Sequence, residues 1–267
     1  MLWDTHMHTR FSGDSDADLD EMVQTAKKLD LKGICITDHL DLDFPDRSET
    51  FDLDIPTYIA TLKTLQEKYS HILPIRIGLE LGLQPHLAPQ HHQLLMDYSF
   101  DFVIGSSHAV HGADTYYPEF YMGRPEEEAY MEYFTSILEN LEVFDEFDVY
   151  GHIDYVVRYG PNRNKFYSYE KYSGVLDEIL KTLISKKKGI ELNTGGLRYG
   201  LGHPNPTEEI LLRYRELGGE IITIGADAHN PAQIGYDFHK VAGILKEAGF
   251  QYYAVFKNRK PEFIKLP

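Results

Sequence analysis

Histidines and carboxylates recur in this sequence at spacings that suit metal binding. His6 and His8 form a His-x-His pair near the start of the chain, and Asp227 and His229 form an Asp-x-His pair near its end. Residues two apart in an extended segment point to the same side, so both imidazoles of the first pair can face one metal ion. Each pair alone is weak evidence, because an isolated histidine usually makes an ordinary hydrogen bond.

Further candidate ligands lie between these two pairs, most of them where an apolar run ends. They are Asp14, His39, Glu80, His108 and His152. Imidazole and carboxylate ligands without thiolate suit zinc, manganese or iron in a hydrolytic site. Burying such groups without partners costs about 1–3 kcal/mol for each one left unsatisfied, and a shared metal satisfies them together. Their coincidence predicts a multinuclear metal site.

The elements that must position these residues alternate regularly along the chain. Apolar, strand-like runs are expected at 2–5, 32–37, 74–81, 102–106, 149–152, 189–192 and 220–224. Amphipathic, helix-like segments are expected at 18–29, 54–69, 88–98, 126–140, 169–187, 207–217 and 233–248. Near-continuous apolar strands separated by helices indicate parallel strands covered on both faces. About seven such units fit one closed α/β barrel domain comprising residues 1–267, with the candidate ligands at the C-terminal strand ends.

Composition and charge argue against several classes of protein. The chain has 26 basic and 42 acidic side chains, and the formal net charge of −16 disfavours binding to a nucleic-acid backbone. Cys35 is the single cysteine, so no intramolecular disulfide can form. No apolar run approaches the roughly 20 residues that a membrane span needs. We therefore expect a cytoplasmic protein with no membrane and no nucleic-acid partner.

Several of these motifs together resemble those of the PHP (polymerase and histidinol phosphatase) family. They are His6-x-His8, Thr37-Asp38-His39, Gly78-x-Glu80, Ser107-His108, Gly151-His152 and Asp227-Ala228-His229, in the expected order over nearly the whole chain. The segment 190–198 also resembles the late substrate-binding segment of the family's monofunctional histidinol-phosphate phosphatases. The resemblance implies a distorted, TIM-like (β/α)7 barrel. It also implies hydrolysis of L-histidinol phosphate by a metal-bridging hydroxide, in histidine biosynthesis.

The resemblance further implies how the ligands divide among three divalent ions, each zinc, iron or manganese. The first ion is held by His6, His8, Glu80 and Asp227. Glu80 bridges to the second ion, which is also held by His108 and His152. The third ion is held by Asp14, His39 and His229.

Residues that contact the substrate are harder to identify from the sequence. Arg158 and Arg198 follow two of the expected strands, and a guanidinium suits paired hydrogen bonds to phosphate oxygens. The alternative for each is a solvated loop arginine that does not contact the substrate. Asp227, His39 or His229 is expected to relay a proton to the leaving alkoxide. The aromatic segment 108–124, which includes His111, either packs against the imidazole of histidinol or closes the barrel edge.

Three other functions compete with this interpretation. The first is a PHP-type phosphoesterase that acts on nucleotides or oligonucleotide ends. The second is a metal-binding domain without activity, and the third is metal-assisted hydrolysis of an amide or lactone. An apparently intact ligand set disfavours the second, and the arginines favour phosphate over the third. The oligomeric state stays open.

Overall fold

Parallel strands form the centre of the molecule. The computed structural model describes residues 2–45 and 51–267. Its main sheet has the order β1 (Trp3–Asp4), β2 (Gly33–Ile36), β4 (Ile75–Gly82), β5 (Phe102–Ser106), β8 (Val149–Tyr150), β9 (Gly189–Asn193) and β10 (Ile222–Gly225), and the short β3 (His39–Leu40) pairs with β4. All pairings in this sheet are parallel.

The sheet curves until its first and last strands meet. The Thr5 amide donates a hydrogen bond of 2.9 Å to the carbonyl of Ile224, and Met7 forms a parallel bridge with Ala228. The result is a nearly closed barrel of seven parallel strands, which confirms the predicted distorted (β/α)7 fold.

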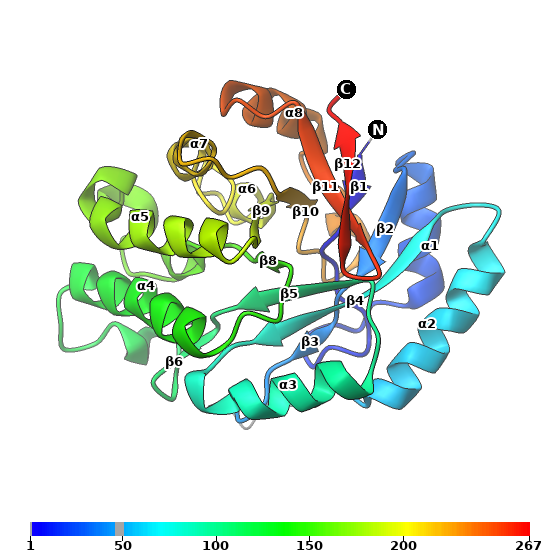
Figure 1. The fold of residues 1–267 in the computed structure, drawn as a ribbon, viewed down its shortest axis with the longest axis horizontal. Helices are drawn as coiled ribbons and strands as arrows, with labels where there is room; N and C mark the ends of the chain where they lie inside the picture. Colours follow the sequence, from blue (N-terminus) through cyan, green and yellow to red (C-terminus); the bar gives the residue numbers. More distant parts are fainter. Residues whose placement is uncertain (1, 46–50) are drawn as a thin grey trace.

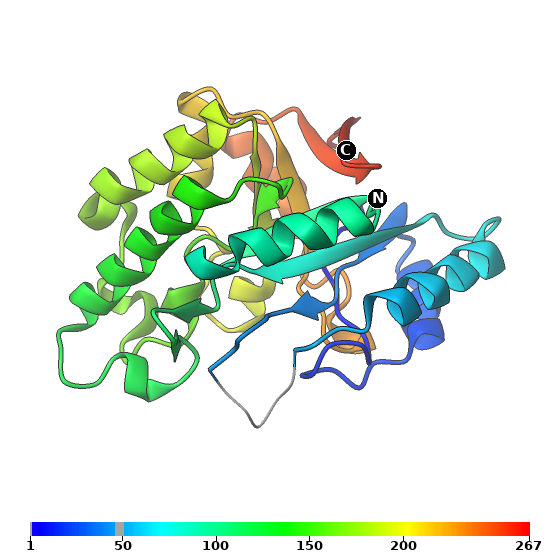
Figure 2. The ribbon, with the colours of Figure 1, turned by 60° about the horizontal axis from the view of Figure 1, so that its bottom comes forward.

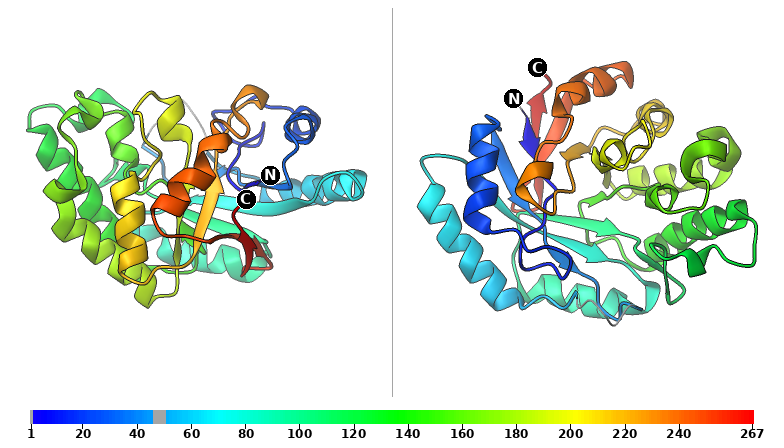
Figure 3. Two further views of the ribbon diagram at one scale, coloured as in Figure 1. Left: turned by 90° about the horizontal axis from the view of Figure 1, so that it is seen from above. Right: turned by 180° about the vertical axis from the view of Figure 1, so that it is seen from behind.

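Helices cover the outside of this barrel (Figures 1, 2 and 3). They are α1 (Leu19–Lys28), α2 (Ile55–Tyr69), α3 (Ala88–Asp97), α4 (Glu126–Val143), α5 (Tyr169–Ser185), α7 (Glu208–Glu216) and α8 (Phe238–Glu247). The short α6 (Gly195–Arg198) instead follows β9 at the end of the barrel where the strands finish. In the described part of the chain, none of the helices has the length and apolar character that crossing a bilayer requires.

Local sequence explains where these helices begin and end, as α1 illustrates. The Asp18 carboxylate caps its first turn by accepting hydrogen bonds from the amides of Asp20 and Glu21. Lys27 and Lys28 stand in the last turn, where positive charge is favourable. The buried residues recur at helical spacing and face the barrel, so the amphipathic pattern fixes the orientation of the helix.

A C-terminal hairpin of β11 (Tyr252–Lys257) and β12 (Lys260–Lys265) pairs antiparallel and stands outside the barrel sheet. Ala254 and Phe256 of β11 pack with Phe102 and Val149, the first residues of β5 and β8. The hairpin therefore closes the end of the barrel where the strands begin, and the Tyr253 hydroxyl of β11 accepts a hydrogen bond of 3.3 Å from the Trp3 amide of β1 there. The opposite end, where the strands finish, is left for the loops that carry the candidate ligands.

Candidate metal centre

All nine predicted metal ligands lie at the C-terminal end of the barrel strands. They are His6, His8, Asp14, His39, Glu80, His108, His152, Asp227 and His229. Most of these side chains are buried, while Asp14 and His229 stand at the rim with 30% and 23% of their side chains exposed. The strand order brings together residues that are more than 200 positions apart in the sequence.

The first group of ligand atoms surrounds one oxygen of Glu80. Glu80 Oε2 lies 3.0 Å from His6 Nε2 and 3.4 Å from His8 Nε2. Asp227 Oδ1 lies 3.8 Å from His6 Nε2 and 3.5 Å from His8 Nε2. Ligand atoms about 2.1 Å from a tetrahedral metal ion lie about 3.4 Å from one another. The atoms of His6, His8 and Glu80 have suitable spacing for a common ion, and Asp227 Oδ1 stands beside the two imidazoles.

The second group surrounds the other oxygen of the same carboxylate. Glu80 Oε1 lies 3.0 Å from His152 Nε2 and 3.4 Å from His108 Nε2, and it accepts a hydrogen bond of 2.7 Å from Ser106 Oγ. Glu80 is fully buried on β4. Its Oε1 faces His108 and His152, and its Oε2 faces His6, His8 and also His39, whose Nδ1 lies 3.2 Å away. This geometry is that of a carboxylate placed to bridge two ions.

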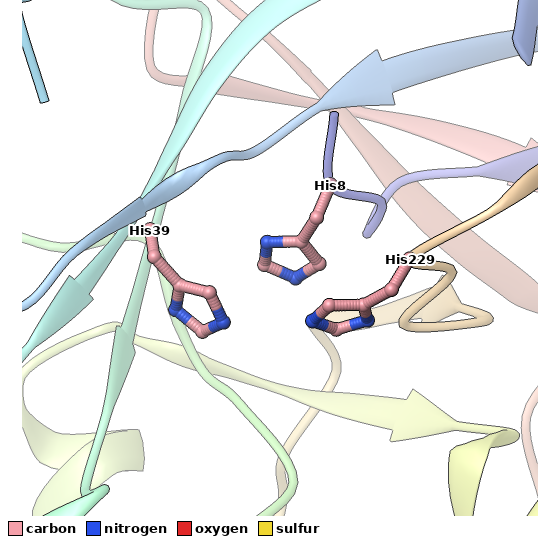
Figure 4. A group of neighbouring side chains, drawn as sticks. All are labelled: His8, His39 and His229. Atoms are coloured by element: carbon pink, nitrogen blue, oxygen red, sulfur yellow. The ribbon is translucent and has the colours of Figure 1, made fainter. Parts of the chain in front are cut away.

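The third group consists of His8, His39 and His229, whose rings face one another (Figure 4). The ring of His8 stacks on those of His39 and His229, with centroid separations of 4.2 and 4.1 Å. Asp14 Oδ2 reaches the same place, at 2.9 Å from His229 Nε2 and 3.8 Å from His39 Nε2. Asp14 and His229 thereby connect the buried ligands with the rim.

Unsatisfied atoms in the cluster test whether metal ions fit it. Among the residues the structure describes, His39 Nδ1, His152 Nδ1 and Asp41 Oδ2 are buried without a hydrogen-bond partner. The Nε2 atoms of His6 and His8 lie 3.1 Å apart, and both face acidic groups. Divalent cations accept imidazole nitrogens and carboxylate oxygens together, so the donor set fits such ions.

The two central carboxylates are held in their charged form. Burial raises the pKa of Glu80, but the imidazoles of His6, His39 and His108 outweigh burial and bring it well below its usual value. Burial likewise raises the pKa of Asp227, and the Arg158 guanidinium together with His6 brings it well below normal. Both groups are therefore anionic at neutral pH, as metal ligands must be.

The two histidines of the first pair are tuned in opposite directions. Burial, together with the neighbouring rings of His229 and His39, lowers the pKa of His8 well below its usual value. Burial also opposes charge on His6, yet the carboxylates of Glu191 and Glu80 raise its pKa well above normal. His8 is thus neutral and has a nitrogen lone pair to offer, and the carboxylates around His6 favour a cation at the same place.

Two acidic residues at the cluster were not among the predicted ligands. Glu191 Oε1 on β9 lies 2.7 Å from His6 Nδ1, on the side of the ring opposite Glu80. Asp41, just after β3, holds His108 Nδ1 at 2.6 Å and lies 3.2 Å from His39 Nδ1. Period-two alternation could have indicated both, because Asp41 follows His39 by two residues and Glu191 precedes Asn193 by two.

The backbone of Asp227 has an unusual conformation that its neighbours stabilise. Its φ of +54° is in the left-handed region, and its amide donates to the carbonyl of His6 at 2.9 Å. Arg158 Nη1 donates to Asp227 Oδ2 at 2.8 Å, which leaves Oδ1 directed at His6 and His8. The strained backbone and the ion pair together determine which oxygen faces the histidines.

The predicted substrate-binding residues lie in different surroundings. Arg158 is buried on the cavity wall, and its other hydrogen bonds go to the side-chain oxygens of Asn205 and Asn193. Arg198 is half-buried at the end of α6; its Nη2 donates to the carbonyl of Asp227 at 2.7 Å, and its Nε has no partner among the described residues. Arg198 does not line the cavity.

His111 lies away from the cluster. It follows β6 (Ala109–Val110), with a φ of +50°, and half of its side chain is exposed. Its ring nitrogens lie 2.8 Å from carboxylate oxygens of Glu132 and Glu139 on α4. The left-handed turn directs the ring toward this helix and a separate surface pocket, so we do not retain His111 as a substrate contact.

A cavity of about 410 Å³ opens next to the ligand cluster. Ligand atoms of the three groups form one part of its wall, and aromatic rings form another; these include Phe44, Phe51, Tyr116, Tyr117, Tyr155, Tyr159 and Tyr199. Segment 108–124 divides between the cavity and the core, and its packing against the imidazole of histidinol stays a prediction. Tyr116 and Tyr117 line the cavity, whereas Phe120 and Tyr121 are buried in the core.

The neighbouring histidines His91 and His92 on α3 have different surroundings. His92 is exposed beside Glu146, but His91 is buried, with Nε2 3.2 Å from the carbonyl of Gly82. One face of α3 packs on the barrel, and the histidine on that face holds the end of β4.

Comparisons with known proteins agree with this architecture. A family model for the PHP domain matches residues 4–195. The histidinol-phosphatase of Lactococcus lactis is 34% identical over 262 residues, which cover 96% of this chain and 95% of that protein. A relative from Clostridium acetobutylicum is also 34% identical, over 89% of this chain and 90% of its own length.

Solved structures show the same similarity in three dimensions. The crystal structure of Lactococcus lactis histidinol phosphate phosphatase, complexed with zinc, L-histidinol and phosphate, matches with a TM-score of 0.91 and 33% identity. The match covers 98% of this chain and 100% of that one. A structure from Listeria monocytogenes shares the fold, with a TM-score of 0.79 at 22% identity over 89% of this chain and 99% of its own.

Proposed function

The chain belongs to the PHP domain family, and from this premise we propose that it is an L-histidinol-phosphate phosphatase of histidine biosynthesis. The observation that carries the proposal is its similarity, over nearly the full length of both chains, to a phosphatase whose crystal structure contains zinc, L-histidinol and phosphate. The chain has its own cluster of histidines and carboxylates beside a cavity of suitable size for a small phosphate monoester.

The site binds divalent metal. Three ions, each zinc, iron or manganese, are our proposal for its content, with the ligands divided as the three groups of atoms suggest. When bound, such ions neutralise phosphate oxygens and lower the pKa of a water molecule enough to make it a nucleophile at neutral pH. Glu80 is the residue that would bring two of the ions close together, because its two oxygens face different histidines.

Asp227 is proposed to move the proton. Arg158 engages its Oδ2 and holds Oδ1 toward the cluster. Oδ1 would give up its contact with the first ion to take a proton from the attacking water, and would then return that proton to the leaving alkoxide. His229 Nδ1 lies 3.1 Å from the carbonyl of Asp227, and a hydrogen bond there leaves Nε2 with its lone pair directed toward the Asp14 side. We therefore assign His229 to metal binding, where its loss removes catalysis indirectly.

The remaining contacts belong to the substrate. Arg158 lines the cavity and retains N–H groups beyond the three that donate to Asp227, Asn193 and Asn205, so it can also contact a phosphate oxygen. Arg198 stands behind Asp227 and outside the cavity wall, so we propose that it acts on the phosphate site through the Asp227 carbonyl that it holds. The aromatic wall, including Tyr116 and Tyr159, is proposed to pack against the imidazole of histidinol.

Phosphate release tests the proposal directly. Metal-replete protein is assayed on L-histidinol phosphate, beside a panel of nucleotides and a generic aryl phosphate. We expect turnover confined to L-histidinol phosphate, with a loss of about 100-fold or more in His229→Ala and Arg198→Ala. Equal rates across the panel would overturn the assigned substrate, and preference for nucleotides would favour the competing phosphoesterase interpretation.

A further inference from the structure

Asp41 is a buried carboxylate at the boundary between two of the ligand groups. It comes two residues after His39, on the same face of the β3 segment, and only 5% of its surface is exposed. β3 pairs with β4 in a register that sets His39 opposite Glu80, so Asp41 is carried toward the ligands of two different groups. It was not among the ligands expected from the sequence.

Each oxygen of Asp41 faces the inner nitrogen of a different imidazole. Oδ1 lies 2.6 Å from His108 Nδ1, in a hydrogen bond. Oδ2 lies 3.2 Å from His39 Nδ1 as an ion-pair contact outside hydrogen-bond geometry, and Glu80 Oε2 approaches the same nitrogen to 3.2 Å. The outer nitrogens of the same rings face acidic groups of the cluster: His108 Nε2 lies 3.4 Å from Glu80 Oε1, and His39 Nε2 lies 3.8 Å from Asp14 Oδ2. By accepting the proton of His108 Nδ1, Asp41 leaves Nε2 of that ring free to bind metal. On His39, the negative charge of Oδ2 beside Nδ1 favours the proton on Nδ1 and leaves Nε2 for the metal.

The ligand atoms of Asp41, His39 and His108 also lie close enough together to share one cation, so positive charge near Asp41 comes from these two rings or from an ion that they hold with it. Among residues 2–45 and 51–267, no lysine or arginine forms an ion pair with it, and its ionic partners are His39 and His108. A buried carboxylate without such partners is costly, so its presence indicates that these two imidazoles need it.

Gly82, at the end of β4, leaves the space that the Asp41 carboxylate occupies, which is an observation independent of the histidine contacts. A Cβ added at Gly82 would overlap Oδ1 of Asp41. Any other residue there would push the carboxylate away from His108, while leaving its charge in the protein.

We propose that Asp41 is a positioning residue shared by two metal subsites: one carboxylate orients His108 in the second group and His39 in the third. The inference rests on the proposed division of ligands among three ions. Its consequence is that two metal ions, not one, bind more weakly when Asp41 is removed. Losing a group that orients a metal ligand weakens metal binding by about 10- to 100-fold.

Metal content tests this without any measurement of activity. Wild-type protein and variants are equilibrated in a series of zinc-buffered solutions, and bound zinc per chain is measured by elemental analysis. We expect Asp41→Ala to weaken two of three zinc ions by about 10- to 100-fold each. Asp41→Asn keeps one acceptor oxygen and should weaken the binding of only one zinc ion. Gly82→Ala should weaken the binding of two zinc ions, as Asp41→Ala does.

Two control variants bracket these outcomes. Glu191→Gln alters the partner of a single ligand ring, that of His6, so one zinc ion should weaken. Asp43→Asn changes an exposed carboxylate two residues beyond Asp41, whose partner is the exposed His86, and all three zinc ions should bind as in wild type. Circular dichroism of each metal-free variant shows whether it is folded. If Asp41→Ala is unfolded, Gly82→Ala takes its place in the zinc-binding measurement.

The outcomes separate this inference from the proposed function. Full zinc binding by wild type, with one ion or none weakened in folded Asp41→Ala and Gly82→Ala, overturns the shared role of Asp41. Wild-type protein that binds fewer than two zinc ions tightly overturns the division into subsites, and the role of Asp41 with it. Phosphatase activity on another substrate affects neither result, because the assay contains no substrate.

Discussion

Glu80 illustrates what can be inferred about a single residue from its position. A carboxylate at the end of an apolar strand, among other strand ends with histidines, was expected to face the same place as they do, and the structure brings it within 3.0 Å of both His6 and His152. Their roles as metal ligands stay predictions. The direction in which a loop turns cannot be read in the same way, and His111 is turned toward α4 by its left-handed backbone.

Arg158 and Arg198 looked alike in the sequence, but the structure separates them. Arg158 is buried and donates to Asp227, Asn193 and Asn205, so Arg158→Met leaves a buried carboxylate without its charged partner. We expect a loss of about 3–5 kcal/mol in the free energy of unfolding of the metal-free protein.

The matched variant is Arg198→Met, which removes one hydrogen bond to a backbone carbonyl and should cost about 1 kcal/mol. Urea unfolding of both metal-free variants measures the difference. Equal losses would mean that the ion pair with Asp227 contributes no more to stability than an ordinary hydrogen bond.

At the scale of elements, strands and helices followed the hydrophobic pattern, and the differences have local causes. The last barrel helix was expected at 233–248 but begins at Phe238, because Asn230 caps a short 3-10 turn and Asp237 is left-handed. The apolar run at 252–256 pairs with β12 in an antiparallel hairpin, a partner that its composition did not reveal. Pairing depends on contacts between segments, which a single segment does not encode.

Glycines at the strand ends show how closely the elements approach at the site. A Cβ at Gly225, the last residue of β10, would overlap the Glu191 carboxylate and the Cβ of His6. We expect Gly225→Ala to lower the free energy of unfolding by about 1–3 kcal/mol, because the overlap forces β9 or the His6 segment to shift.

Gly174 in α5 is the matched control, since no atom lies within 4 Å of a Cβ placed there. Gly174→Ala should raise stability by about 0.5–1 kcal/mol, because glycine loses more conformational freedom in a helix than alanine. Thermal unfolding measures whether Gly225→Ala loses stability while Gly174→Ala gains it. A loss of stability in both variants would show that the close contacts at Gly225 are not what makes its substitution destabilising.

For the whole molecule, the fold class could be predicted because seven strand and helix units of this length fit a closed barrel. Two features could not. The barrel closes through Thr5 and Ile224, residues at opposite ends of the chain. The contacts of Asp41 with His108 and of Glu191 with His6 join different strands, so the sequence could indicate the carboxylates but not their partners. The assignment of residues 1–267 to one domain stays a prediction.

Metal removal is the test that involves the entire molecule. The formal charge of the chain is −16, and stripping the ions leaves the buried carboxylates of Glu80 and Asp227 without the cations that we propose balance them. An ion present at 100 times its dissociation constant stabilises the folded state by about 2.7 kcal/mol, so three such ions contribute about 8 kcal/mol. One kcal/mol corresponds to about 2–4 °C in a chain approaching this size, so chelation should lower Tm by more than about 15 °C.

Calorimetry with and without EDTA measures this shift, and zinc or manganese added back in excess of the chelator should restore the original Tm. Restoration matters because it separates loss of metal from irreversible unfolding. If Tm does not change although elemental analysis confirms that the metal is gone, the cluster is stable without cations. The histidine and carboxylate contacts would then have to satisfy one another through shared protons, and the proposed trinuclear centre would lose its physical basis.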